Sequence, residues 1–159
     1  MELTTCLWAN NNAREMATFY TKIFPKSSVD DNWITQADTP GNQSGDEVFV
    51  SFKIFGQKFI ALNGGPRFPH TEAVSFQIPC DDQNEIDKYW NLLIKDGGEE
   101  SQCGWLKDKF GISWQITSPR MLDFIAGPDT EGAKRATEAM LQMKKIDLNI
   151  LAIAYKGTI

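Results

Sequence analysis

Histidine and cysteine are both scarce in this sequence of 159 residues, which has one histidine, His70, and three cysteines, Cys6, Cys80 and Cys103. One imidazole cannot build a three-histidine zinc site, and a sparse, odd set of cysteines without a CxxC pair predicts neither disulfides nor zinc. We therefore expect reduced thiols and a cytoplasmic location. No apolar run approaches the roughly 18 residues that span a bilayer, and the N-terminus does not have the pattern of a signal peptide.

Basic residues are also fewer than acidic residues. Lysine and arginine number 16 against 21 aspartates and glutamates, which gives a net charge of −5. Nucleic-acid binding needs a basic face, and a polybasic membrane anchor needs clustered cations, so we expect neither partner. Apolar residues, in contrast, make up 42% of the chain and aromatic residues 11%, which is enough to build a core without disulfide staples.

The first half of the chain predicts a strand, a helix and further strands. A strand over 3–9 is followed by a helix over 13–24, whose apolar residues recur at helical spacing. A polar stretch with one short strand then leads to two strand-like runs, 47–55 and 57–63, with a hairpin turn at Gly56.

The same order of elements returns in the second half. A strand over 73–79 precedes a helix over 84–95, and a hairpin follows at 104–107 and 112–117. We interpret this order as an internal repeat of βαβββ units, because the elements and the helix phase agree. At the offset that aligns Phe19-Tyr20 with Tyr89-Trp90, Thr5 aligns with Ser75.

The repeat defines the expected architecture, an α+β fold in one domain over 1–159. It consists of two tandem βαβββ modules, at 1–66 and 70–118, and a helical tail at 119–159 with helices expected over 133–145 and 146–155. The tail has no counterpart in the first half and is expected to cover a sheet edge or a partner.

Four segments carry a resemblance to a known family: 12–20, 59–66, 103–115 and 140–148. On these segments the chain resembles the vicinal oxygen chelate superfamily of glyoxalase I, bleomycin-resistance proteins and extradiol dioxygenases. It is most similar to the PhnB-like branch, often labelled demethylubiquinone methyltransferase-like. The resemblance implies curved mixed sheets that enclose a half-barrel cavity, and a homodimer that sometimes exchanges modules.

Metal-using members of the superfamily hold an ion with histidine, glutamine or glutamate side chains on the first and last strands of each module. The resemblance places these positions at Thr5, Ser75 and Gln115, with a fourth between Ile60 and Asn63. None of these residues is a histidine or a carboxylate, and neutral oxygens do not compensate the charge of a dication. We therefore expect no metal site.

The methyltransferase label raises the question of a nucleotide-type cofactor. Asn63-Gly64-Gly65 follows a strand, but the next residues, Pro66-Arg67-Phe68-Pro69, cannot begin a helix with amides that face a phosphate. We interpret this segment as a linker between modules and expect no cofactor.

Three tryptophans on expected strands suggest an aromatic cavity. Trp8, Trp105 and Trp114, together with the amides of Asn63 and Gln115, would suit a flat or apolar small molecule. Ordinary hydrophobic packing explains the same tryptophans equally well.

Candidate catalytic groups are few. His70 is a candidate general base and Cys103 a candidate nucleophile, while Glu47 and Asp108 are candidate carboxylates. An exposed linker histidine and a packed thiol are the simpler interpretations of the first two.

These observations favour metal-independent binding of a small aromatic or apolar ligand. The alternative is an enzyme, a lyase, isomerase or methyltransferase-like protein, that acts on a small molecule in the same cavity. A third reading is an interaction protein whose own side chains fill the cavity.

Overall fold

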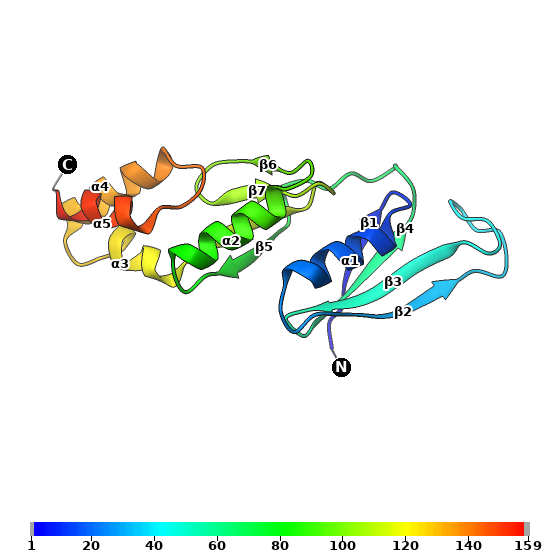
Figure 1. The fold of residues 1–159 in the computed structure, drawn as a ribbon. Helices are drawn as coiled ribbons and strands as arrows, with labels where there is room; N and C mark the ends of the chain where they lie inside the picture. Colours follow the sequence, from blue (N-terminus) through cyan, green and yellow to red (C-terminus); the bar gives the residue numbers. More distant parts are fainter. Residues whose placement is uncertain (1, 158–159) are drawn as a thin grey trace. The chain divides into compact units, whose positions relative to one another are not determined.

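The computed structural model describes residues 2–157 and divides the chain into two compact units, of which the first ends at His70 and the second begins at Thr71. Each unit contains a four-stranded mixed sheet, and a long helix covers one face of it (Figure 1). The expected α+β fold built from two βαβββ modules is confirmed.

The first unit consists of β1 (Thr5–Ala9), α1 (Ala13–Ile23), β2 (Ser28–Ile34), β3 (Glu47–Ile54) and β4 (Gln57–Asn63). Its strand order is β1-β4-β3-β2, with β1 parallel to β4 and the other pairs antiparallel. The amphipathic stripe of α1 packs on this sheet through Tyr20, whose ring stacks on Phe52 at 6.1 Å, and Phe52 stacks on Phe59 at 5.4 Å. These stacked rings form the centre of the core of this unit.

The hairpin between β3 and β4 turns at Phe55 and Gly56. Both residues have positive φ angles, 51° and 83°, as a two-residue type I′ turn requires. The turn matches the twist of the strands and places Ile54 opposite Gln57.

The second unit begins with β5 (Ser75–Pro79), α2 (Gln83–Ile94), β6 (Glu99–Glu100), β7 (Trp105–Lys107) and β8 (Ser113–Thr117). The strand order is β5-β8-β7-β6, the same arrangement as in the first unit. Asp82 caps α2 by accepting a hydrogen bond from the backbone N of Glu85 at 3.0 Å. The strand β6 was not expected, because two exposed glutamates carry no strand pattern.

The tail belongs to the second unit and consists of a 3₁₀ turn (Pro119–Met121), α3 (Leu122–Ile125), α4 (Thr130–Leu141) and α5 (Leu148–Lys156). The sequence predicted helices over 133–145 and 146–155, but α4 ends earlier. The reason is tertiary: the backbone N atoms of Cys103 and Gly104 donate to the carbonyls of Met143 and Lys144, at 2.8 and 2.7 Å. Within residues 2–157, no helix has both the length and the apolar character needed to cross a membrane.

Candidate functional site

The sheet of the first unit has one face under α1 and an opposite face, here called the first open face. Side chains alternate along each strand, so that buried Leu7 and Ala61 lie on the helix side. The residues of β1, β3 and β4 on the first open face are Cys6, Trp8, Phe49, Ser51, Lys53, Lys58, Ile60 and Leu62. Its aromatic residues, Trp8 and Phe49, lie on either side of Leu62, and the two lysines pair at the other end of the strands.

Trp8 on the first open face is held by contacts with the segment that follows β4. Its indole Nε1 donates to the carbonyl of Gly65 at 2.7 Å, and its ring meets Phe68 edge-on at 4.8 Å. Gly64 packs so closely on the indole that a Cβ there would lie 2.0 Å from Trp8 Cζ2. The segment after β4 thus folds over Trp8 and fixes the orientation of its ring.

His70 belongs to the same arrangement. Its Nε2 lies 2.7 Å from the carbonyl oxygen of Trp8, so Nε2 carries the hydrogen and donates it. Only Nδ1 is left to accept a proton. The geometry explains His70 as a tether for β1, and its role as a general base stays a prediction.

The second unit also has an open face, opposite α2, which we call the second open face. Its residues are Ser75, Gln77, Pro79, Glu99, Trp105, Lys107, Ser113, Gln115 and Thr117, of which Ser113 is buried, and Ile78, Leu106 and Ile116 alternate with them on the α2 side. Trp105 and Gln115 are cross-strand neighbours, and Gln115 Nε2 donates to Ser75 Oγ at 2.8 Å. Two of the expected ligand-binding residues therefore lie side by side here.

Trp114 lies on the other side of the same sheet. It is 3% exposed, its ring lies 5.3 Å from that of Phe76, and its Nε1 donates to Asp108 Oδ2 at 2.8 Å. Asp108 is itself buried and also accepts from the backbone N atoms of Phe110 and Ile112. This position does not fit the predicted ligand role of Trp114, and it makes Asp108 an organiser of the turn between β7 and β8.

The alignment of Thr5 with Ser75 is a further point that the structure corrects. Thr5 pairs with Phe59 on the α1 side of its sheet, whereas Ser75 lies on the second open face. A shift of one residue in a strand moves every side chain to the opposite face, so a small error in the offset is enough. Cys6, not Thr5, is the residue of β1 on the first open face near its start.

The donor atoms of both open faces do not fit a divalent metal ion. Their β1, β4, β5 and β8 positions offer a thiol, hydroxyls and amides, but no imidazole or carboxylate. In the described part of the chain, no three His, Cys, Asp or Glu side chains gather in a way that would hold a metal.

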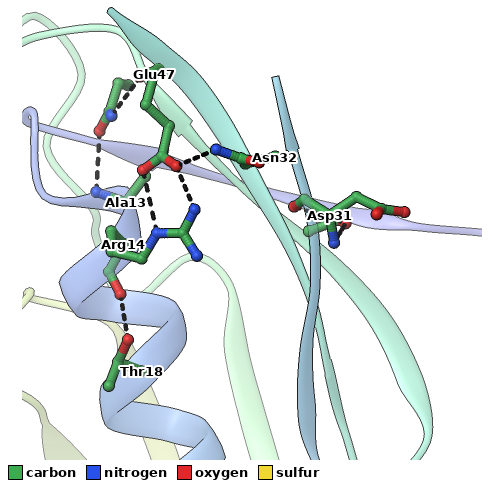
Figure 2. A network of polar contacts seen from close by, with 8 residues as sticks. Ala13, Arg14, Thr18, Asp31, Asn32 and Glu47 are labelled. Atoms are coloured by element: carbon green, nitrogen blue, oxygen red, sulfur yellow. Dashed lines mark hydrogen bonds and ion pairs between the residues drawn. The ribbon is translucent and has the colours of Figure 1, made fainter. Parts of the chain in front are cut away.

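A polar pocket of about 390 Å³ lies in the first unit, at the carboxyl ends of β1 and β4. Its lining residues are Asn11, Arg14, Gly41, Asn42, Asp46, Glu47 and Asn63. Figure 2 shows Glu47 between Arg14 of α1 and Asn32 of β2. The sequence did not suggest Arg14, because it meets Glu47 from 33 positions away.

The charged side chains that line the polar pocket are paired, but this pairing does not occupy all of their polar atoms. Arg14 binds Glu47 through two nitrogens, with Nε 3.3 Å from Oε2, and Asn32 Nδ2 donates to Glu47 Oε1 at 2.6 Å. The hydrogen bond from Arg14, with a smaller contribution from Asn32, holds the pKa of Glu47 below its usual value, against the effect of burial. Glu47 is therefore ionised at neutral pH.

Asn63 lines the polar pocket but has a structural task. Its Oδ1 accepts from the backbone N of Ala13 at 2.9 Å, and its Nδ2 donates to the carbonyl of Glu47 at 2.8 Å. It thereby caps α1 in place of Asn12, which makes no capping bond. The amide expected to bind ligand instead ties three elements together.

Residues 1–117 match the model of the 3-demethylubiquinone-9 3-methyltransferase family. The chain belongs to this family. It is similar to the PhnB protein of Bacillus cereus, with 29% identity and a TM-score of 0.65 over 74% of this chain and 99% of that one. This confirms the expected PhnB-like, demethylubiquinone methyltransferase-like branch.

Two other solved structures share the fold of this PhnB-like chain. Protein PA1353 from Pseudomonas aeruginosa is 17% identical, with a TM-score of 0.58 over 74% of this chain and 97% of its own. Protein SA1046 from S. aureus is 15% identical, with a TM-score of 0.51 over 74% and 93%. No curated protein is significantly similar to the chain.

The name of the family raises the question of a methyl donor, and the glycine pair after β4 does not form a nucleotide loop. Gly64 N donates to the carbonyl of Ala9 at 3.0 Å, and Gly65 accepts from Trp8. A turn at 66–67 follows in place of a helix. This segment of the PhnB-like chain holds an indole and presents no helix N-terminus to a phosphate.

Cys103 has a structural position in the PhnB-like chain. It adopts a φ of 54°, and its Sγ lies 3.6 Å from the carbonyl of Met140 in the tail. Together with its backbone bond to Met143, this contact holds the tail on the second unit. The arrangement favours a packed thiol over a nucleophile.

Proposed function

We propose that this PhnB-like protein binds a small aromatic or apolar organic molecule on its open sheet faces, without a metal ion. One observation carries the proposal: Trp8 stands half-buried on the first open face and is held by Gly64, Gly65 and Phe68. An aromatic surface that is already fixed in orientation loses little entropy when it binds a flat ligand.

The neighbours of Trp8 support a ligand of this kind. Leu62 is its direct partner on β4, and Phe49 is the partner of Leu62 on β3. All three side chains are half-buried and therefore available for contact. The second open face, taken by itself, offers a similar combination, since the ring of Trp105 lies beside the amide of Gln115, which would orient a polar group of a ligand bound there.

The name of the family favours a second candidate, an enzyme that transfers a methyl group to an aromatic substrate on the same face. In that case His70 Nδ1 is the available base, and His70→Ala would abolish turnover. We further propose a cytoplasmic homodimer. The support is that β1 and β2 are the edge strands of the first sheet, each with one backbone edge left to pair.

The experiment is a fluorescence titration with 1-anilinonaphthalene-8-sulfonate as the aromatic probe. We expect Leu62→Ala to weaken binding roughly tenfold, because it removes apolar contact area beside Trp8. The matched control is Leu141→Ala at the exposed end of α4, which should bind the probe as the wild type does. EDTA should leave the affinity unchanged.

Three results would count against the proposal: equal affinity of Leu62→Ala and wild type, loss of binding in EDTA, or stoichiometric metal in the purified protein. A methylated product formed from S-adenosylmethionine and a small phenol, and lost in His70→Ala, would favour the enzyme instead.

A further inference from the structure

The polar pocket differs in chemistry from both open faces. Its lining side chains are three amides, two carboxylates and one guanidinium, with Gly41 as the remaining residue. No aromatic or aliphatic side chain lines it, so it does not suit the apolar ligand of the proposed function. Its volume, about 390 Å³, is in the range of sites for small molecules.

An ion pair and hydrogen bonds among their own residues hold together the segments that form the pocket. Arg14 of α1 and Glu47 of β3 form an ion pair, and Asn63 of β4 bonds to the backbone of both elements. Asn42 Nδ2 in the loop before β3 donates to the carbonyl of Asn63 at 2.8 Å. Fixed walls lower the entropic cost of binding.

Several polar groups that line the pocket still have bonding capacity. Arg14 has five N–H donors and uses two nitrogens on Glu47, so its other terminal nitrogen is left for an acceptor. Asp46 accepts from Gln43 N through Oδ2 at 2.7 Å, which leaves Oδ1. Within residues 2–157, the side chain of Asn11 makes no hydrogen bond.

The lining favours a ligand with two opposite charges over a simple ion. Its two carboxylates and one guanidinium repel a free anion, and a free cation would meet Asp46 but leave the third nitrogen of Arg14 without an acceptor. A molecule with both an ammonium and a carboxylate group can bind a lining carboxylate with the first group and Arg14 with the second, so each of its charges meets the opposite charge.

We propose that the polar pocket is a second binding site, which takes a small zwitterionic amino acid with its carboxylate at Arg14 and its ammonium at Asp46. Asn11 and Asn42 hold its remaining polar groups. This site is separate from the open faces and does not depend on the proposed function.

The test is isothermal titration of the full chain with L-serine, with acetate and methylammonium as probes that carry one charge each. We expect L-serine to bind at millimolar concentrations or below and the two single-charge probes to bind at least tenfold more weakly. Asp46→Asn removes the charge that faces the ammonium and should weaken binding roughly tenfold or more.

The matched control is Asp38→Asn, because Asp38 lies in the same loop, accepts from Ser44 N at 2.9 Å and does not line the pocket. It should bind L-serine as the wild type does. If Asp46→Asn does not fold, Asn11→Gly serves as the second variant, since glycine tolerates the φ of 58° and removes only the amide. The proposal is overturned if wild type does not bind L-serine, or if the pocket variant that folds binds it as tightly as Asp38→Asn does.

Discussion

Glu47 has hydrogen-bond partners on two elements, Arg14 on α1 and Asn32 on β2. The pair with Arg14 lowers the pKa of its carboxyl below 4.5, and burial opposes this shift. Since half of the Arg14 side chain is exposed, solvent screens the pair and keeps its energy modest.

We expect Glu47→Gln to lower the free energy of unfolding by about 1 kcal/mol at pH 7. A carboxyl with a depressed pKa stabilises the folded state above its unfolded pKa, and this contribution disappears as the pH falls through the folded value. The difference between wild type and variant should therefore be full at pH 7 and shrink below pH 4.5. Urea denaturation at several pH values measures it, with Glu138→Gln on α4 as the control. A difference that grows in acid would contradict the sign of the shift.

Trp8 and Trp114 differ in the face of the sheet on which their side chains lie. Both lie on strands, as the sequence predicts, but Trp8 lies on an open face and Trp114 lies in the core. Leu7 and Ala9 flank Trp8, so alternation does not assign its face, whereas Trp114 stands between polar Ser113 and Gln115, a pattern that by itself indicates a buried side chain. The bond of Trp114 to Asp108 depends on the turn between β7 and β8.

Among the elements, the segment after β4 has the most direct effect on the proposed ligand face. Gly64 continues the pairing with Ala9, Gly65 accepts from Trp8, and His70 bonds to the backbone of Trp8. The sequence indicated only a linker here, because the contacts join residues more than 50 positions apart.

Gly64→Ala should displace the indole of Trp8, because the new Cβ would lie 2.0 Å from the ring. We expect a loss of about 1–3 kcal/mol in unfolding free energy and weaker binding of the anilinonaphthalene probe. Gly45→Ala is the control, since open space surrounds Gly45 and only its φ of 96° opposes a side chain. Probe binding that survives Gly64→Ala unchanged would separate Trp8 from the ligand face.

At the scale of the whole molecule, the tail is the part that lies outside the family match, which ends at residue 117. It is nevertheless part of the core of the second unit. Ile146 and Leu151 are fully buried, and Gln83 of α2 bonds to the carbonyl of Ile146 at 2.9 Å and to Leu148 N at 2.9 Å. The stability of the second unit therefore includes the tail.

We expect Ile146→Ala to lower the free energy of unfolding of the second unit by about 2–5 kcal/mol, because it leaves a cavity in a packed core. Ile150→Ala is the matched control, since Ile150 is 44% exposed and its truncation should cost less than about 1 kcal/mol. Denaturation curves of the two variants measure the difference. Equal stabilities would mean that the tail is only loosely attached.

The sequence by itself determined the order of the helices and strands other than β6 and the repeat of two modules, because hydrophobic periodicity and turn residues act over a few neighbouring positions. It also predicted the family. Tertiary structure decided the rest. The register of β1 on β4 placed Thr5 under α1, and the pairing of Arg14 with Glu47 built a pocket from residues 33 positions apart. Such contacts depend on packing between distant segments, which local patterns do not contain.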